Sequence, residues 1–189
     1  MSDESALISD QRPLALWIVI PVAVVFAALI VLLATRETNE DGLPDFTLGG
    51  DLAPAVVGTT VTGDPFDLDD LRGQFVVVNF FQTTCVPCIQ EHPELVKFQE
   101  ANAPRGIASI VSIAFDDSSS AIIEFFEEAG GDWPVIAADT AAFAVEYGVV
   151  AVPESILIAP SGEVITKVIG GVTQGDLESL IIEWQEGDA

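Results

Sequence analysis

Basic side chains are scarce in this sequence. Its 189 residues include 6 lysines and arginines against 30 aspartates and glutamates, which gives a formal net charge of −24 at pH 7. A surface of this sign repels nucleic acid and anionic lipid headgroups, so neither is expected as a partner. The acidity suits a salt-rich habitat, a cationic partner or a solvated surface, and it affects solubility rather than the fold.

Cysteine and histidine are also scarce, with two cysteines and one histidine in the chain. These residues can supply neither a framework of several disulfides nor the four ligands of a structural zinc site. We therefore expect no metal and no cofactor. The two cysteines nevertheless stand together in Cys85-Val86-Pro87-Cys88. Two cysteines at random positions would take this spacing about 1% of the time, so the arrangement is informative.

One uncharged stretch, residues 14–34, is long enough to cross a membrane. At about 1.5 Å per residue it spans about 30 Å, the thickness of the hydrocarbon core of a bilayer. Arg12 and Arg36 flank it, and Trp17 lies near its first end. Pro21 can kink such a helix without preventing it. We expect a retained single-pass anchor; the alternative, a cleaved signal peptide, usually has a shorter apolar core and a clear cleavage site.

The predicted organisation has four parts. A short N-terminal tail at residues 1–13 precedes the anchor at 14–34. Residues 35–43 are polar and charged, as in a short linker. Residues 44–189 then form one domain without internal repeats.

Strand-like and helix-like segments alternate in this domain. Residues 75–81 (FVVVNFF) and 108–115 are apolar runs typical of strands buried on both faces of a sheet. Asp117 or Ser118 can cap a helix, as both residue types do. The pattern predicts an α/β domain with a mixed central sheet flanked by helices. The remaining predicted elements are hairpins at 55–68 and 155–169, a strand at 135–138, and helices at 88–101, 140–147 and 176–184.

The cysteine pair follows the apolar strand at residues 75–81 and begins the next helix. Unpaired N–H groups and the positive end of a helix dipole favour a thiolate there, so Cys85 should be a good nucleophile. The spacing lets Cys88 attack a mixed disulfide formed at Cys85. Pro87 stiffens the loop and lacks an N–H that the helix start would leave unpaired. A static disulfide, half of a zinc site and two inert thiols are the alternatives to redox catalysis.

Three stretches resemble the membrane-anchored thioredoxin-like thiol–disulfide oxidoreductases of the TlpA/ResA/CcmG (DsbE) group. VVVNFFQTTCVPCIQEHPEL resembles the active-site segment of that group, including a helix proline, Pro93, five residues after the second cysteine. GVVAVPESILIAPSGEV resembles the later segment in which a cis-proline, here Pro153, faces the cysteines. APAVVGTTVTGDPFDLDDLRGQ resembles the N-terminal β extension of the group. The resemblance implies a thioredoxin-like fold.

The resemblance also implies roles for individual residues. Cys85 is the attacking thiolate, Cys88 is the resolving thiol, and the two form the redox-active disulfide. Pro153 in the cis form holds its loop against the pair and exposes the Val152 backbone to a substrate strand, beside Pro87.

Three further acidic or basic positions also have interpretations. Glu91 matches a carboxylate that manages the protons of the cysteines, and a solvated helix glutamate is its alternative. Glu154 matches a substrate-site residue of the haem-maturation branch, or else is an exposed loop glutamate. His92 is expected at the surface. The chain departs from the group at Thr84 and Phe81, where tryptophans are common. Thr84 removes an aromatic surface beside the nucleophile, which affects partner choice and redox potential but not the thiol chemistry.

The function implied is extracytoplasmic reduction of disulfides in exported proteins, such as apocytochrome c during cytochrome c maturation. A membrane thiol reductant of the CcdA or DsbD type would re-reduce the cysteines. Disulfide oxidation and general disulfide reduction are alternatives. A peroxiredoxin is disfavoured because Gln82 stands where that class has threonine. A copper-assembly protein is disfavoured because His92 is too near the cysteines in sequence to serve as the distal ligand.

Overall fold

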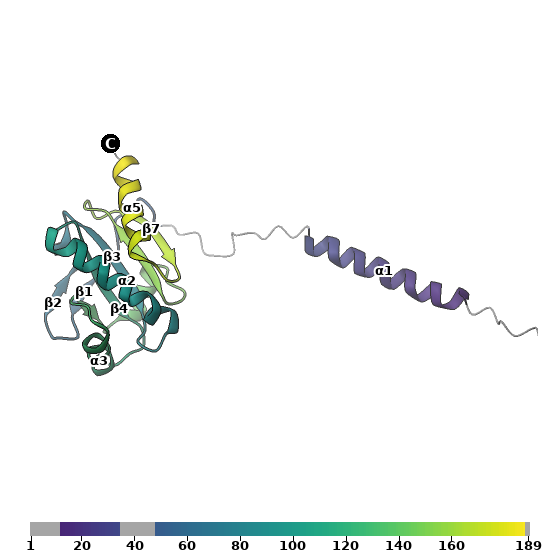
Figure 1. Ribbon diagram of the computed structural model, residues 1–189, viewed down its shortest axis with the longest axis horizontal. Coiled ribbons are helices and arrows are strands. Elements are labelled where there is room, and N and C mark those ends of the chain that lie inside the picture. Colours follow the sequence, from purple (N-terminus) through teal and green to yellow (C-terminus); the bar gives the residue numbers. More distant parts are fainter. Residues whose placement is uncertain (1–11, 35–47, 188–189) are drawn as a thin grey trace, which may run out of the picture. The chain divides into compact units, whose positions relative to one another are not determined.

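The computed structural model describes residues 12–34 and 48–187, and it divides the chain into two units, Met1–Asp45 and Phe46–Ala189 (Figure 1). In the first unit, helix α1 runs from Arg12 to Ala34 and contains Pro21. Among the described residues, no helix meets the length and apolarity that crossing a membrane requires. Most of the predicted tail and the whole predicted linker lie outside the described residues.

The second unit is built on a five-stranded sheet in the order β5-β4-β3-β6-β7. Strand β3 is central; it pairs parallel with β4 and antiparallel with β6. Strand β5 extends the sheet parallel to β4, and β7 extends it antiparallel to β6. The predicted mixed α/β sheet is therefore confirmed. The strands are β3 (Phe75–Phe81), β4 (Ala108–Ala114), β5 (Val135–Ile136), β6 (Glu154–Ile158) and β7 (Val164–Ile169).

Helices cover both faces of this sheet, and strands β3, β4 and β6 are accordingly buried on both sides. Side chains of α2, α3 and α5 share one buried cluster with Val77 and Phe81 of β3. Side chains of α4 share the opposite cluster with Val76, Val78 and Phe80, as the alternation of a strand requires. The helices are α2 (Val86–Asn102), α3 (Ser119–Ala129), α4 (Thr140–Glu146) and α5 (Gln174–Gly187), with short 3₁₀ turns η2 (Leu68–Leu71) and η3 (Ala103–Arg105).

The N-terminal extension is a two-stranded antiparallel hairpin of β1 (Val57–Thr59) and β2 (Pro65–Asp67). Its strands are shorter than predicted because the turn already begins at Thr60, whose carbonyl accepts the Gly63 N–H. Tyr147, at the end of α4, donates a hydrogen bond to the carbonyl of Pro54 at 2.6 Å. The extension thus packs on the α4 side of the sheet.

Candidate active site

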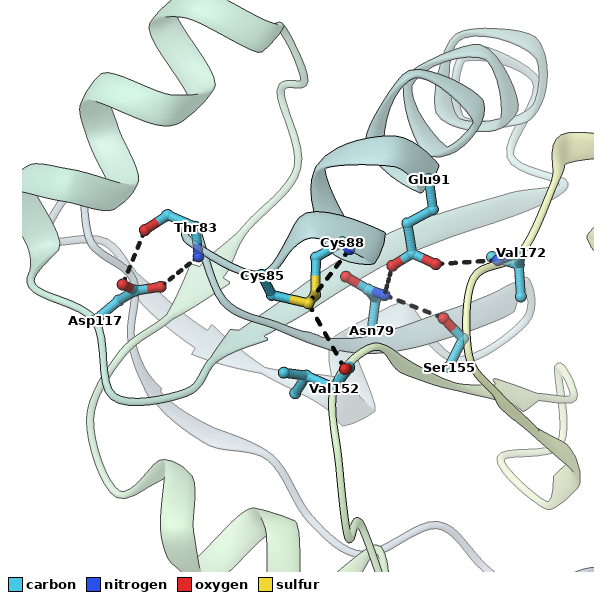
Figure 2. Close-up of a disulfide and its surroundings, with 9 residues drawn as sticks. All are labelled: Asn79, Thr83, Cys85, Cys88, Glu91, Asp117, Val152, Ser155 and Val172. Carbon is cyan, nitrogen blue, oxygen red and sulfur yellow. Dashed lines mark hydrogen bonds between the residues drawn. A yellow bond between two sulfur atoms is a disulfide. The ribbon is translucent and has the colours of Figure 1, made fainter.

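The cysteine pair stands where the sequence placed it, at the start of α2 after β3. Cys85 has extended backbone angles and is the N-cap residue of α2, which begins at Val86, with Pro87 in its first turn. Cys85 and Cys88 are joined by a disulfide. The Cys88 N–H lies 3.3 Å from Cys85 Sγ (Figure 2). After reduction, this N–H is a donor that can stabilise a thiolate at Cys85.

The two sulfur atoms differ in access. Cys85 is half-buried, whereas Cys88 is 3% exposed and packs in the core on the buried side of α2. Val86 and Pro87, between them, are exposed. A disulfide approaching from solvent therefore meets Cys85 first, and Cys88 is reached only after Cys85 has reacted.

The loop that precedes β6 faces the cysteines. The Val152–Pro153 peptide bond is cis, as the resemblance implied. The carbonyl oxygen of Val152 lies 3.6 Å from Cys85 Sγ (Figure 2). Val152 is half-buried and Pro153 is buried, so the backbone of this loop forms one wall beside Cys85.

Glu91 lies one helical turn after Cys88 and points into the protein, so its alternative placement as a solvated glutamate is wrong. Its side chain accepts hydrogen bonds from Asn79 Nδ2 and from the Val172 N–H, each at 3.0 Å (Figure 2). Burial raises the pKa of Glu91 from its ordinary 4.5 to about 7, and the bonds from Val172 and Asn79 only partly oppose this. Glu91 can therefore exchange a proton at neutral pH.

A buried polar network around Glu91 was not predicted from the sequence. Asn79 pairs across the sheet with Ser112 on one side and with Ser155 on the other. Asn79 Nδ2 also donates to Ser155 Oγ at 3.1 Å, and Trp133 Nε1 donates to Ser112 Oγ at 2.8 Å. The sequence signal that could have revealed this network is a polar residue in each of three largely apolar strands. Buried polar side chains at such positions need hydrogen-bond partners.

Glu154 is not the exposed loop glutamate that was one of its two interpretations. It is the first residue of β6, its side chain is 0% exposed, and it forms an ion pair with Lys167 at 2.7 Å. Its other carboxylate oxygen accepts the N–H groups of Val150 and Ala151. An enclosed side chain of this kind reaches a substrate only through the loop that it holds.

The prediction of a surface position for His92 is wrong, because α3 covers it. Its side chain packs against the rings of Phe125, Phe126 and Trp133, and it is 3% exposed. Its Nε2 forms a hydrogen bond with the carbonyl of Gly130 at 2.8 Å. Burial lowers the pKa of His92, and the Gly130 carbonyl opposes this. The residue joins α2 to the end of α3.

The loop before Cys85 is fixed by Asp117. The carboxylate of Asp117 accepts the Thr83 N–H at 2.7 Å and the Thr83 hydroxyl at 2.9 Å (Figure 2). Ser118, rather than Asp117, is the N-cap residue of α3. Thr84 is exposed beside Cys85, so this position offers a small polar side chain next to the nucleophile.

Comparison with known proteins decides the family. The redoxin family matches residues 40–181, which is more than half of the chain. The chain belongs to the redoxin family. Within the described residues of this redoxin, no cluster of three or more histidine, cysteine or acidic side chains is arranged to hold a metal ion.

Relatives of this redoxin are thiol–disulfide proteins. It is 31% identical over 132 residues to the thiol-disulfide oxidoreductase ResA of Bacillus thuringiensis, covering 70% of this chain and 76% of ResA. It is 29% identical over 144 residues to the thiol:disulfide interchange protein HelX of Rhodobacter capsulatus, covering 75% and 78%.

A solved structure agrees with this placement. The crystal structure of a putative thiol:disulfide interchange protein DsbE from Chlorobium tepidum is 26% identical, with a TM-score of 0.65, over 71% of this chain and 96% of that one. The membership in the TlpA/ResA/CcmG group and the thioredoxin-like fold are thus confirmed. This redoxin is a thiol–disulfide oxidoreductase, and it has a Cys85–Cys88 disulfide.

Proposed function

We propose that this redoxin reduces disulfides in exported proteins, with Cys85 as the attacking thiolate and Cys88 as the resolving thiol. The observation that carries the proposal is the unequal access of the two sulfurs at the start of α2, where Cys85 is half-buried and Cys88 is 3% exposed. An accessible first thiol and a covered second thiol are what a two-step exchange through a mixed disulfide needs.

In the first step, the Cys85 thiolate attacks one sulfur of the substrate disulfide, which forms a mixed disulfide and releases the other substrate sulfur as a thiolate. In the second step, the Cys88 thiolate attacks Cys85 Sγ and releases the second substrate sulfur. The substrate gains two electrons and two protons, which come from the two enzyme thiols. The enzyme is left with the Cys85–Cys88 disulfide.

We assign to Glu91 the transfer of the Cys88 proton. Its pKa of about 7 allows it to accept and return a proton at neutral pH, and it lies on α2 one turn after Cys88. Pro153 and the Val152 backbone are assigned the wall that an extended substrate segment contacts, beside the exposed Pro87. Glu154 supports this wall from within the fold.

Apocytochrome c is the client we propose, since its C-x-x-C-H motif must be reduced before haem attachment. The support is the resemblance of the active-site and cis-proline segments to the TlpA/ResA/CcmG group, and of Glu154 to the haem-maturation branch of that group. A membrane dithiol protein of the CcdA or DsbD type would supply the two electrons that re-reduce Cys85–Cys88. Such a reductant is useful on the extracytoplasmic side, where thiols tend to be oxidised.

We further propose that residues 14–34 anchor the protein, with the catalytic domain outside the membrane. The support is the uncharged stretch of the sequence, which lies within helix α1. Membrane fractionation tests this: the full chain should stay with membranes after carbonate washing, and release into the wash would contradict the anchor.

The deciding measurement is the reduction potential of a fragment beginning at Leu43, equilibrated against glutathione or dithiothreitol. A value near the roughly −270 mV of thioredoxin supports electron donation to exported disulfides. A value near the roughly −120 mV of a strong oxidant would keep the cysteine chemistry and reverse its direction to disulfide formation.

A further inference from the structure

The wall beside Cys85 is a loop without regular secondary structure. Residues 147–153 connect α4 to β6, and Gly148, Val150 and Ala151 are exposed. Val152 of this loop approaches Cys85, with its carbonyl oxygen 3.6 Å from Cys85 Sγ. The N–H groups of residues 147–149 bond to carbonyls at the end of α4. The exposed residues that follow, Val150 and Ala151, need a further device to hold their backbone in one arrangement, because ordering each free residue costs conformational entropy.

Glu154 and Lys167 bind this loop at three places. One carboxylate oxygen of Glu154 accepts the N–H groups of Val150 and Ala151, each at 3.1 Å. Lys167 Nζ donates to the carbonyl of Gly148 at 2.5 Å. The ion pair between Lys167 Nζ and the second carboxylate oxygen of Glu154 measures 2.7 Å and closes the set. The start and the middle of the loop are thus tied to β6 and β7.

The pair is enclosed within the fold. The side chain of Lys167 is 7% exposed, and that of Glu154 is 0% exposed. Ile156 pairs with Lys167 across the sheet, so Glu154 and Lys167 lie on the same face, the one that α4 covers. Burying two charges is costly, and such pairs are weak evidence for stability as such. Both side chains form hydrogen bonds to the same loop, which indicates a role in positioning that loop rather than in stability.

We propose that Lys167, acting through Glu154, is a positioning residue that holds loop 148–152 in the arrangement that receives a polypeptide substrate. It touches neither the reacting sulfurs nor the substrate. The loop meets its substrate already ordered, so binding does not have to supply the ordering energy. This inference rests on the proposed role of the Val152 backbone as a substrate wall.

The test compares a protein disulfide with a small one. In the full-length protein, Lys167→Met should raise KM for insulin reduction by about tenfold, because the loop must be ordered on binding. The rate of reaction with oxidised glutathione, a small disulfide that needs little of the loop, should change less than about twofold. Lys167→Arg retains the cation and should restore most of the insulin activity. The matched control is Lys97→Met, which breaks an exposed pair with Glu94 and should change neither reaction.

A second readout addresses the loop itself. Amide hydrogen exchange at Val150 and Ala151 should accelerate in the Lys167→Met variant, while exchange in β3 stays as in the wild type. A Glu154→Gln/Lys167→Met double variant, which leaves no lone buried charge, should show the same loop exchange and the same rise in KM. Unfolding of both variants, or equal losses with insulin and oxidised glutathione, would overturn the proposal by assigning the pair to the stability of the whole sheet.

The two proposals fail differently. If the wild type does not reduce insulin, the proposed reductase function fails whatever the loop does. If loop exchange accelerates while KM for insulin stays unchanged, Lys167 holds the loop but the loop does not receive the substrate, and the present inference is overturned. Unchanged exchange at Val150 and Ala151 would overturn it as well.

Discussion

Two buried glutamates lie on opposite faces of the sheet, and they differ in the charge of their partners. Glu91 lies on the α2 face and accepts hydrogen bonds from uncharged donors, the Asn79 amide and the Val172 N–H. Glu154 lies on the α4 face and pairs with the Lys167 ammonium. Both are close to fully buried, with exposed fractions of 4% and 0%.

The difference shows that burial alone does not decide what a carboxylate does. With uncharged partners, desolvation dominates and raises the pKa of Glu91 to about 7, which suits a group that exchanges protons. With a lysine beside it, the charge of Glu154 is compensated, and the carboxylate can hold two loop N–H groups. One side of the active site is therefore suited to proton transfer and the other to positioning.

The largest effect is expected at Cys85, because thiol–disulfide exchange cannot begin without the attacking thiolate. Cys85→Ser should abolish insulin reduction, because Cys88 is 3% exposed and cannot replace the nucleophile. Cys88→Ser is the matched control: it should retain the first attack and accumulate a mixed disulfide that mass spectrometry detects. Retained turnover in Cys85→Ser would refute the assignment of the nucleophile.

The next largest effect is expected from breaking the charged pair. Glu154→Gln leaves the Lys167 ammonium buried without its counter-ion, and loss of one partner of a buried pair typically costs about 3–5 kcal/mol. Urea unfolding at neutral pH should show this loss in the free energy of unfolding. Removing both charges in Glu154→Gln/Lys167→Met should recover most of it. If Glu154→Gln lowered the free energy of unfolding no more than Glu91→Gln does, the charged pair on the α4 face would not differ in this respect from the uncharged network on the α2 face.

Glu91→Gln should change the pH dependence of stability. Between about pH 4.5 and about 7 the folded protein keeps a proton on Glu91 that the unfolded chain has lost, so the wild-type free energy of unfolding falls as pH rises. Relative to the variant, this fall should amount to at most about 3 kcal/mol. Urea unfolding of both proteins across this range measures it, and parallel curves would contradict the raised pKa. The pH dependence of thiolate formation, followed by ultraviolet absorbance, should change as well.

The smallest effect is expected at a third carboxylate, half-buried Asp117, which holds the loop before Cys85. Asp117→Ala removes both hydrogen bonds to Thr83 and should cost about 1–2 kcal/mol of unfolding free energy. Asp117→Asn keeps an acceptor for the Thr83 N–H and should lose much less. Equal losses in the two variants would show that the charge of Asp117, rather than its hydrogen bonds, holds the loop.

Patterns within a few residues predicted much of the fold. The apolar run FVVVNFF is a strand at its predicted position, and the cysteine pair stands at the following helix start. The helix begins at Val86, two residues before the predicted residue 88, because Cys85 itself is the N-cap residue. The turn at Thr60 shortened the predicted first hairpin. Element order and type depend on neighbouring residues, whereas exact ends depend on capping geometry.

The environment of the carboxylates could not be predicted in the same way. Glu91, His92 and Glu154 each had a surface interpretation in the sequence, and all three are buried. Their burial depends on partners far along the chain, such as Val172 for Glu91 and Gly130 for His92. A helical or strand period shows which residues share a face, but not which element covers that face.

The sequence by itself determined the redox pair, the order of strands and helices and the acidic character of the chain, because these follow from composition and spacing. Only the tertiary structure decided which sulfur is accessible and that Asn79, Ser112 and Ser155 form one network beside Glu91. It also decided that the side chain of Lys167, in β7, contacts Glu154 and the loop beside Cys85. The physical reason is that desolvation and charge compensation arise between segments brought together by folding, and no local pattern encodes them.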